Sequence, residues 1–540
     1  MTVGQRFLAA SCVLISVLAS RPAEAQAAAT SDGARCPSPA PFIDPPGSAH
    51  WTSWGVGVTN TRFQPGEQAR LTIDQVPKLK LKWAFGFPGA GAAYAQPMIA
   101  GGRLFVGSQN GSVFALDAKS GCTYWTFMAA AGVRSAITLG TRKVNGREAY
   151  TLYFGDIKAR VYALDAATGD LLWARKLDDH QFARVTGAPT LFEGKLYVPL
   201  ASFEEPAARN PRYECCTFRG SLVALDAESG AVAWKTYTIS EEPRPLGKTT
   251  AGTERYGPSG AGVWGAPTID ARRRVVYIAT GNMYTEPTQR TSDAVMAIDL
   301  ASGKVKWTNQ LTPKDVWVVG CDTQAPNCPA PGTLGPDFDF GQGAMLTTVN
   351  GRDMLVIGQK SGIGWALDPA RQGAVAWQYR AGRGSTSGGM HFGSALDGEQ
   401  VYFPVSDASN REPGAVPGGL HAVRLDTGQR VWYTPPPPPK CGTGLNCNGA
   451  QSNAITVIPG VVFSGSFDGA MRAFSSKDGA IVWEFDTNRE FDTVNGVKAK
   501  GASIGGNAGP VVVDGMVYVS SGYDGPGGRP GNVLLAFGVE

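Results

Sequence analysis

The segment Ala115-LDAKSGCTY-Trp125 consists of a short apolar run, a turn rich in Asp, Ser and Gly, and a second run that ends in Trp. Two strand-forming runs separated by such turn residues predict a β-hairpin. The same pattern returns at Ala163–Trp173, Ala224–Trp234, Ala297–Trp307, Ala366–Trp377, Ala422–Trp432 and Ala473–Trp483. A supersecondary unit that recurs along a chain indicates a repeat architecture.

Each hairpin belongs to a larger unit, because another pair of short strands precedes most copies, as in Gly102-RLFVGSQNGSVFALD. Measured between turn aspartates, one repeat spans 48 residues from Asp117 to Asp165, and another spans 73 residues from Asp226 to Asp299. Four short strands at such a period are typical of a blade of a β-propeller.

The number of blades follows from the tryptophans. Trp83, in Leu79-KLKWAF, matches the end of one more blade and brings the matched Trp to eight. Val533-LLAF, near the last residue, predicts a strand that joins the first blade and closes the ring, which removes exposed sheet edges. The sequence therefore predicts an all-β fold, an eight-bladed β-propeller.

Composition excludes several classes of protein. Gly makes up 70 of 540 residues without a three-residue period, and 43% of residues are hydrophobic, which excludes collagen-like and disordered chains. A net charge of +4 over 540 residues is too small to indicate a nucleic-acid-binding protein. The four His have no metal-ligand spacing, which argues against a His-built zinc site.

Residues 1–25 resemble a secretory signal peptide. Arg6 supplies the basic start, Phe7 to Leu18 form the apolar stretch, and Ala23-Glu24-Ala25 forms a small-x-small cleavage site. The apolar stretch is short for a membrane span, although an anchor is the alternative interpretation. We expect export to the periplasm, one propeller domain at residues 26–540, and no membrane span in the mature chain.

The cysteines fit an exported protein. Of nine Cys, Cys12 lies in the predicted signal, and the remaining eight are an even number, as expected in an oxidising compartment. Local spacing suggests the pairs Cys321–Cys328 and Cys441–Cys447. Cys215 and Cys216 are adjacent, and Cys36 and Cys122 remain as a candidate pair by elimination. The sequence contains no CxxCH, so it encodes no covalent haem.

The long connections between strands are where function is expected. They are residues 203–219, 240–263, 283–293, 312–343, 383–393, 405–418 and 434–453.

The repeats and several loop phrases resemble one enzyme family. The Ala-x-Asp-x-x-Thr/Ser-Gly-x-x-x-Trp repeats are similar to the tryptophan-docking motifs of the pyrroloquinoline-quinone (PQQ) alcohol dehydrogenases. The phrases Trp51-TSWG, Cys215-Cys216-TFRG, Gly335-PDFDFG, Gly358-QKSG and Thr493-VNGV are most similar to members that oxidise polyvinyl alcohol. The resemblance covers about residues 50–540 and implies PQQ and calcium as cofactors.

The resemblance implies which residues hold the quinone. Trp264, in Ala261-GVWGAP, matches the Trp that forms the floor under the planar ring, with an ordinary core Trp as the alternative. Arg134 and Thr186 match residues on the quinone carboxylates, and Arg134 could instead be a surface Arg. Cys215 and Cys216 match a disulfide between adjacent cysteines above the quinone, unless each has a separate partner.

The same resemblance implies a calcium site. Glu204 and Asn282 match the family's metal ligands at the expected spacing, and Asp337 completes the set. Carboxylate and amide oxygens are the ligands that calcium prefers. Glu205 and Glu214 are competing choices for the Glu.

The catalytic residues are expected in two loop phrases. Asp337, in Gly335-PDFDFG, matches the base that removes the hydroxyl proton, and Asp339 is the reserve. Eighteen extra residues after Trp317 make this register different from that of many family members, and Asp often simply makes turns. Lys360, in Gly358-QKSG, matches the basic residue that reaches the quinone carbonyls.

Together these matches predict a periplasmic PQQ- and calcium-dependent dehydrogenase that oxidises secondary alcohols, polymeric ones included, to ketones and passes electrons to a separate cytochrome c. The alternatives are a quinoprotein that oxidises other alcohols or aldoses, and a non-enzymatic periplasmic scaffold.

Overall fold

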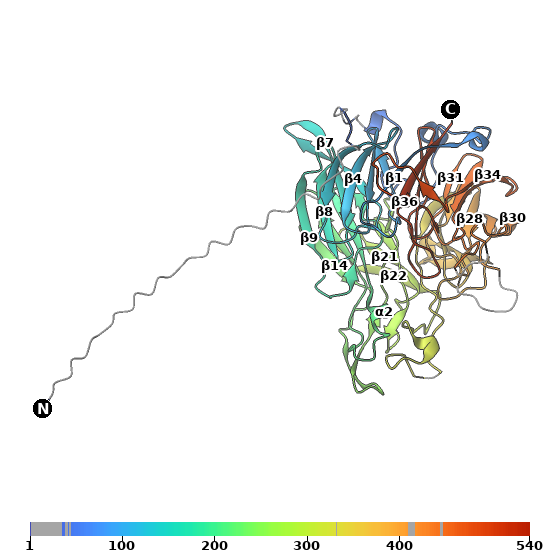
Figure 1. Ribbon diagram of the computed structural model, residues 1–540. Helices are drawn as coiled ribbons and strands as arrows, with labels where there is room; N and C mark the ends of the chain where they lie inside the picture. The colour runs from blue at the N-terminus through green and yellow to red at the C-terminus, as the bar shows by residue number, and fades with distance from the viewer. Residues whose placement is uncertain are drawn as a thin grey trace.

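The structure, a computed structural model, describes residues 1, 35–37, 42, 45–330, 332–408, 416–442 and 446–539. Its strands form eight antiparallel sheets, seven with four strands and one with five, arranged as the blades of a propeller (Figure 1). The predicted all-β, eight-bladed fold is confirmed. The predicted signal peptide and Cys12 lie outside the described residues, apart from Met1.

The first four blades follow one another along the chain. Blade 1 contains β2 (Met98–Ala100), β3 (Arg103–Gly107), β4 (Ser112–Asp117) and β5 (Thr123–Met128), and blade 2 contains β6 (Thr138–Val144), β7 (Arg147–Gly155), β8 (Arg160–Asp165) and β9 (Leu171–Lys176). Blade 3 contains β10 (Ala183–Arg184), β11 (Thr190–Phe192), β12 (Lys195–Ser202), β13 (Ser221–Asp226) and β14 (Val232–Tyr237), and blade 4 contains β18 (Thr268–Asp270), β19 (Val275–Ala279), β21 (Ala294–Asp299) and β22 (Val305–Gln310).

The remaining blades complete the ring. Blade 5 contains β23 (Met345–Val349), β24 (Arg352–Gly358), β25 (Ile363–Asp368) and β26 (Ala374–Arg380), and blade 6 contains β27 (Ala395–Leu396), β28 (Gln400–Pro404), β29 (Leu420–Arg424) and β30 (Arg430–Thr434). Blade 7 contains β31 (Thr456–Ile458), β32 (Val461–Gly465), β33 (Ala470–Ser475) and β34 (Ile481–Asp486). Blade 8 combines β37 (Val511–Val513), β38 (Met516–Ser521) and β39 (Val533–Gly538) with β1 (Lys80–Gly86), so the two ends of the chain close the ring.

Short elements decorate the connections. They are η2 (Pro45–Gly47), α1 (Gly66–Ala69), η3 (Val76–Lys78), α2 (Glu204–Ala207), η4 (Cys321–Thr323), η5 (Pro369–Arg371), and the strand pairs β15 (Arg244–Lys248) with β16 (Glu254–Gly257), β17 (Ser259–Gly260) with β20 (Met283–Thr285), and β35 (Glu490–Phe491) with β36 (Ala499–Lys500). Figure 1 shows α2 among loops that project from one end of the ring.

Each blade is joined to the next by the Trp of its outermost strand. The Trp173 indole N–H donates to the Ala227 carbonyl at 3.1 Å, and the ring lies against Gly230. Gly230 has a φ of +67°, and a Cβ there would lie 2.7 Å from the ring, so glycine is required. Equivalent indole donations come from Trp83, Trp125, Trp234, Trp377, Trp432 and Trp483. Trp307 lies against Gly373.

Residues 51–64, here called the central segment, run past the innermost strands of several blades. Backbone N–H groups of Ile99, Leu139, Ile269, Leu346, Leu396 and Val457 donate, in that order, to the carbonyls of Trp51, Thr52, Val58, Thr59, Thr61 and Arg62. The Arg62 side chain is fully buried and donates to the carbonyls of Trp54 and Ile455 and to the amide oxygen of Gln96. The central segment therefore links blades that are not neighbours.

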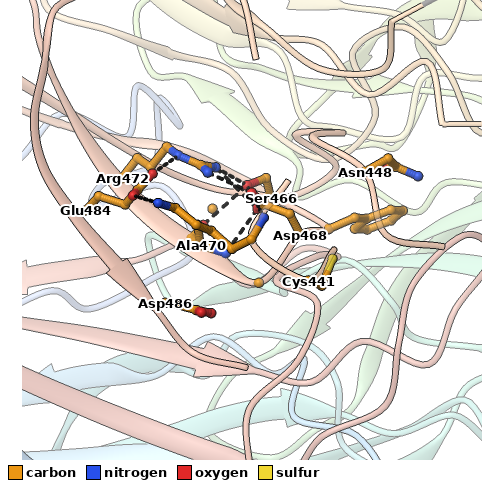
Figure 2. Close-up of polar contacts among 12 residues, drawn as sticks. Cys441, Asn448, Ser466, Asp468, Ala470, Arg472, Glu484 and Asp486 are labelled. Carbon is orange, nitrogen blue, oxygen red and sulfur yellow. Dashed lines mark hydrogen bonds and ion pairs between the residues drawn. The ribbon is translucent and has the colours of Figure 1, made fainter. Parts of the chain in front are cut away.

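An ion network in blade 7, buried at Arg472 and Asp468 and exposed at Lys440, fixes one of the long insertions. Arg472, on β33, is buried and pairs with Asp468 and Glu484 at 2.7 Å each (Figure 2). Glu484 also pairs with Lys440 at 2.6 Å. Burial raises the pKa of Asp468, but hydrogen bonds and the charge of Arg472 outweigh burial and the pKa is lowered. The network holds the start of the loop that the Cys441–Cys447 disulfide closes.

The described residues contain four disulfides: Cys36–Cys122, Cys215–Cys216, Cys321–Cys328 and Cys441–Cys447. The pairings suggested by local spacing and by elimination are confirmed. In the part of the chain that the structure describes, no helix has the length and apolar character needed to cross a membrane.

The docking geometry predicts different costs for two glycine substitutions. Gly230→Ala should lower the free energy of unfolding by about 1 kcal/mol for the left-handed backbone and by a further 1–3 kcal/mol or so for the clash with Trp173. Gly146→Ala is the matched control, because Gly146 has a φ of +77° and nothing within 4 Å of an added Cβ. Urea denaturation measures both. Equal losses in the two variants would contradict the docking role.

Candidate active site

Loops from several blades enclose a cavity of about 340 Å³. The lining includes most of the residues predicted from the sequence: Arg134, Thr186, Trp264, Asn282, Asp337, Asp339 and Lys360. These residues are separated by as many as 226 positions (Arg134 to Lys360) in the sequence. The closed ring brings them together, because their loops leave the blades at the same end.

Trp264 comes from the segment before β18 and forms one wall of the cavity. The rings of His391 and Phe392 meet its indole nearly at right angles, with centroids 5.6 and 5.9 Å away. The Lys360 ammonium lies 5.4 Å from the indole centroid. The indole is thus fixed by its neighbours while it still lines the cavity. Such a wall can stack against a flat aromatic ligand.

A buried cluster of three charges lies beside this wall. Lys360 Nζ is 3.0 Å from Asp337 Oδ1 and 2.6 Å from Asp339 Oδ2, and all three side chains are buried. Burial lowers the pKa of Lys360, but the two aspartates outweigh burial and the net direction is upward. Burial raises the pKa of Asp337 well above its usual value; Lys360 opposes the rise and the charge of Asp339 adds to it. Asp337 is therefore a stronger base than an exposed Asp.

The two aspartates are held differently. Asp339 accepts a hydrogen bond from Lys360 and another, at 2.6 Å, from the backbone N–H of Asn282, so both of its oxygens are engaged. Among the described residues, Asp337 has a side-chain hydrogen bond only through Oδ1. Its backbone is fixed instead, because its N–H donates to Asp315 at 3.0 Å. One carboxylate oxygen of Asp337 thus remains for a ligand.

Asn282 follows β19 and lines the cavity. Its side-chain nitrogen donates to the carbonyls of Met283 and Trp317 at 3.1 and 2.8 Å. These two bonds use the amide nitrogen, so the side-chain oxygen is the atom left to bind a cation.

The structure does not bring Glu204 together with the other predicted residues. Its carboxylate accepts hydrogen bonds from Tyr213 Oη at 2.7 Å and from the backbone N–H groups of Thr217 and Phe218 at 2.8 Å. The next residue, Glu205, lines the cavity instead. Burial, and then the charge of Asp339, raises the pKa of Glu205 to about 8. The competing choice Glu205, and not Glu204, thus shares the cavity with Asn282 and Asp337.

Arg134 and Thr186 present polar atoms that nothing in the described structure satisfies. The Arg134 Nε and Thr186 Oγ1 atoms are buried and have no hydrogen-bond partner. The Arg134 guanidinium lies over the Tyr94 ring at 5.1 Å. Buried donors without acceptors are costly, so this wall suits a ligand rich in acceptor oxygens.

The Cys215–Cys216 disulfide is formed but is not among the described residues that line the cavity. Both cysteines are fully buried in a cluster of apolar side chains that includes Tyr284 and Val318. Tyr284 itself lines the cavity, so the disulfide belongs to the layer of side chains behind that wall.

The lining residues that were not identified from the sequence include Arg184, His391 and Tyr523. Burial, and then the charges of Lys360 and Arg134, lowers the pKa of His391 well below its usual value, so its ring is neutral. Arg184 could have been found, because it precedes Thr186 by two residues and residues at that spacing share one face of an extended chain.

Among the residues that the structure describes, no three His, Cys, Asp or Glu side chains are grouped to hold a metal ion.

Two family models match the chain. One, described as the β-propeller domain of glucose, ethanol and alcohol dehydrogenases, matches residues 51–330. The other, described as outer membrane protein assembly factor BamB, matches residues 219–521. The two matches overlap.

Curated relatives cover almost the whole chain. A polyvinylalcohol dehydrogenase from Pseudomonas sp. is 45% identical over 520 residues, which are 94% of this chain and 80% of the relative. A second polyvinylalcohol dehydrogenase, from Sphingopyxis sp. (strain 113P3), is 41% identical over 525 residues, which are 94% of this chain and 79% of that relative.

A solved structure shows the same fold. The quinohemoprotein alcohol dehydrogenase from Comamonas testosteroni superimposes with a TM-score of 0.65 at 19% identity, and the match covers 91% of this chain and 80% of that one.

The charge cluster predicts that Lys360 is needed for stability. Lys360→Met leaves two buried carboxylates without a counter-ion, so the free energy of unfolding at neutral pH should fall by about 3–5 kcal/mol. Burial raises the pKa of Asp337, and a carboxyl whose pKa is raised by folding destabilises the folded state as pH rises, so the deficit should shrink in acid. Lys306→Met is the control, because its pair with Asp299, at 3.1 Å, is partly exposed and should cost less than about 1 kcal/mol. Denaturant titrations at two pH values measure both variants, and similar losses would contradict the prediction.

Proposed function

This chain belongs to the family of PQQ-dependent alcohol dehydrogenases, and on that premise we propose that it oxidises secondary alcohols, including polyvinyl alcohol, to ketones with PQQ and calcium. The match to polyvinylalcohol dehydrogenases over 94% of the chain supports this substrate class. The observation that carries the proposal is the cavity itself, where an aromatic wall, unsatisfied donors and a buried Lys–Asp cluster converge.

The residues present fit the proposed cofactors. The indole of Trp264 offers the stacking wall, and the orphaned donors of Arg134 and Thr186 suit the carboxylates of PQQ. Lys360 would reach the quinone carbonyls. When bound, the quinone supplies two-electron oxidising chemistry and the calcium ion supplies Lewis-acid polarisation.

The proposed calcium ligands are Glu205, Asn282 and Asp337. All three line the cavity and offer hard oxygen atoms. Glu205 replaces Glu204 in this set, because the carboxylate of Glu204 is already occupied by Tyr213 and two backbone N–H groups. Cys215 and Cys216 would support the cavity wall from behind, by packing in the same apolar cluster as Tyr284.

Asp337 is the proposed catalytic base. Its raised pKa and its unengaged oxygen suit removal of the hydroxyl proton of an alcohol, whereas both oxygens of Asp339 are already used. Lys360 holds the two carboxylates in place and offsets their negative charge. Burial of the cluster keeps water from the proton transfer.

The proposed location is the periplasm and the proposed electron acceptor is a separate cytochrome c. The location rests on the predicted signal peptide at residues 1–25, ahead of one propeller domain at residues 26–540. The acceptor is proposed from the resemblance to the family, because a quinone that has been reduced by an alcohol must pass its electrons on before the next turnover.

Reconstitution tests the function. The apoprotein loaded with PQQ and calcium should reduce an artificial electron acceptor when polyvinyl alcohol or a small secondary alcohol is added. Primary alcohols and aldoses, tested in parallel, separate the proposed substrate class from the other quinoprotein substrates. Bound quinone without oxidation of any alcohol would overturn the proposal.

The assignment of the base predicts a difference between two variants. Asp337→Asn should retain PQQ binding and lower kcat by about 10²- to 10⁴-fold, the usual contribution of a general base. Asp339→Asn should have a smaller effect on kcat because this side chain positions Asn282 and Lys360. Steady-state kinetics and PQQ titration measure both, and the reverse order would assign the base to Asp339.

The two adjacent glutamates give a test of the calcium site. Glu205→Gln should abolish the rise in melting temperature that calcium causes in the PQQ-loaded protein. Glu204→Gln should lower the melting temperature of the apoprotein, because a carboxylate oxygen no longer accepts from backbone N–H groups, and should keep the calcium response. Differential scanning calorimetry with and without a chelator measures both. A calcium response lost only in Glu204→Gln would restore Glu204 as the ligand.

A further inference from the structure

We propose that Arg184 is a second anion-binding side chain of the cavity and that, together with Arg134, it holds carboxylates of the quinone, an inference that rests on the proposed function. No role follows for Arg184 from the resemblance described above. Its backbone position, its orphaned donor and its uncompensated charge carry the proposal.

The strand that carries Arg184 positions it at the cavity wall. β10 pairs with the end of β12, with Arg184 opposite Ala201, and both residues line the cavity. The guanidinium carbon lies 4.2 Å from the centroid of the Phe203 ring. This aromatic contact orients the flat guanidinium and covers one side of it.

Arg184 has no counter-ion in the described structure. Its Nε is buried without a hydrogen-bond partner, and none of the described carboxylates forms an ion pair with it or with Arg134. Burial, and then the positive charge of Arg134, lowers the pKa of Arg184 to about 10. By contrast, Lys360 in the same cavity has two aspartate partners.

Arg134 and Arg184 are half-buried, each has a buried Nε without an acceptor, and neither has an ion pair among the described residues. This arrangement is costly, and a neutral alcohol cannot compensate two positive charges. An anion that reaches both groups would satisfy the orphaned Nε atoms and reduce their repulsion. Guanidinium groups bind carboxylates through paired hydrogen bonds. A planar ligand with more than one carboxylate, which can also stack on Trp264, fits this arrangement, and PQQ has that chemistry.

The experiment measures PQQ binding to the calcium-loaded full chain by quenching of tryptophan fluorescence. Arg184→Gln should raise the Kd for PQQ about 10- to 100-fold, the effect of losing a charged hydrogen bond. Arg184→Lys, which keeps the charge but not the fork, should fall between wild type and Arg184→Gln. Arg371→Gln, at an exposed position in η5, is the control and should bind PQQ like wild type.

Two further measurements separate anion binding from a structural role. The trimethyl ester of PQQ has no carboxylate charge, so Arg184→Gln should bind it as well as wild type does. The melting temperature of the Arg184→Gln apoprotein should equal or exceed that of wild type, because the repulsion from Arg134 is gone.

The outcomes are distinct. Equal PQQ affinity in wild type and Arg184→Gln would overturn this inference and leave the proposed function standing. An equal loss of affinity for PQQ and for its ester would make Arg184 structural and would also overturn it. A wild-type protein that does not bind PQQ would overturn the proposed function and this inference together.

Discussion

The contact of an indole with a turn glycine of the next blade is the interaction on which the rest of the structure depends. Each tryptophan donates to, or packs on, a backbone that belongs to its neighbour, as Trp173 does with Ala227 and Gly230. Residues of the cavity come from loops on different blades, for example Thr186 and Lys360. The distances between these cavity residues therefore depend on the angle between neighbouring blades. The docked tryptophans fix that angle.

The cavity separates two kinds of charge. Lys360 is compensated by Asp337 and Asp339, whereas Arg134 and Arg184 have no ion pair in the part of the chain that the structure describes. Half-buried charge of one sign without partners is tolerated where a ligand of the opposite sign supplies the balance. The same cavity thus offers negative oxygens to a cation and positive groups to an anion, which suits a cofactor that binds together with a metal ion.

The repeats made the fold readable from sequence, because a hairpin that ends in Trp has the same physical role in every blade. The sequence also predicted that Trp264 and Asn282, which lie beside repeated strands, would share one site, and both line the cavity. It left open which glutamate lines the cavity, since consecutive residues of the short helix α2 point about 100° apart and only the folded backbone decides between Glu204 and Glu205. The position of the Cys215–Cys216 disulfide behind the cavity wall could not be predicted from the sequence either, because it depends on the conformation of a loop.

The central segment has a consequence for how the chain folds. The ribosome synthesises this segment early, but the Arg62 side chain donates to the carbonyl of Ile455, 393 residues further along the chain. Closing so long a loop costs entropy before any contact compensates for it, and contacts between distant residues slow folding. The segment cannot reach its native position until the blades around it exist. We therefore expect the first residues of the propeller to order among the last, so that the centre of the ring is completed only when synthesis is nearly over.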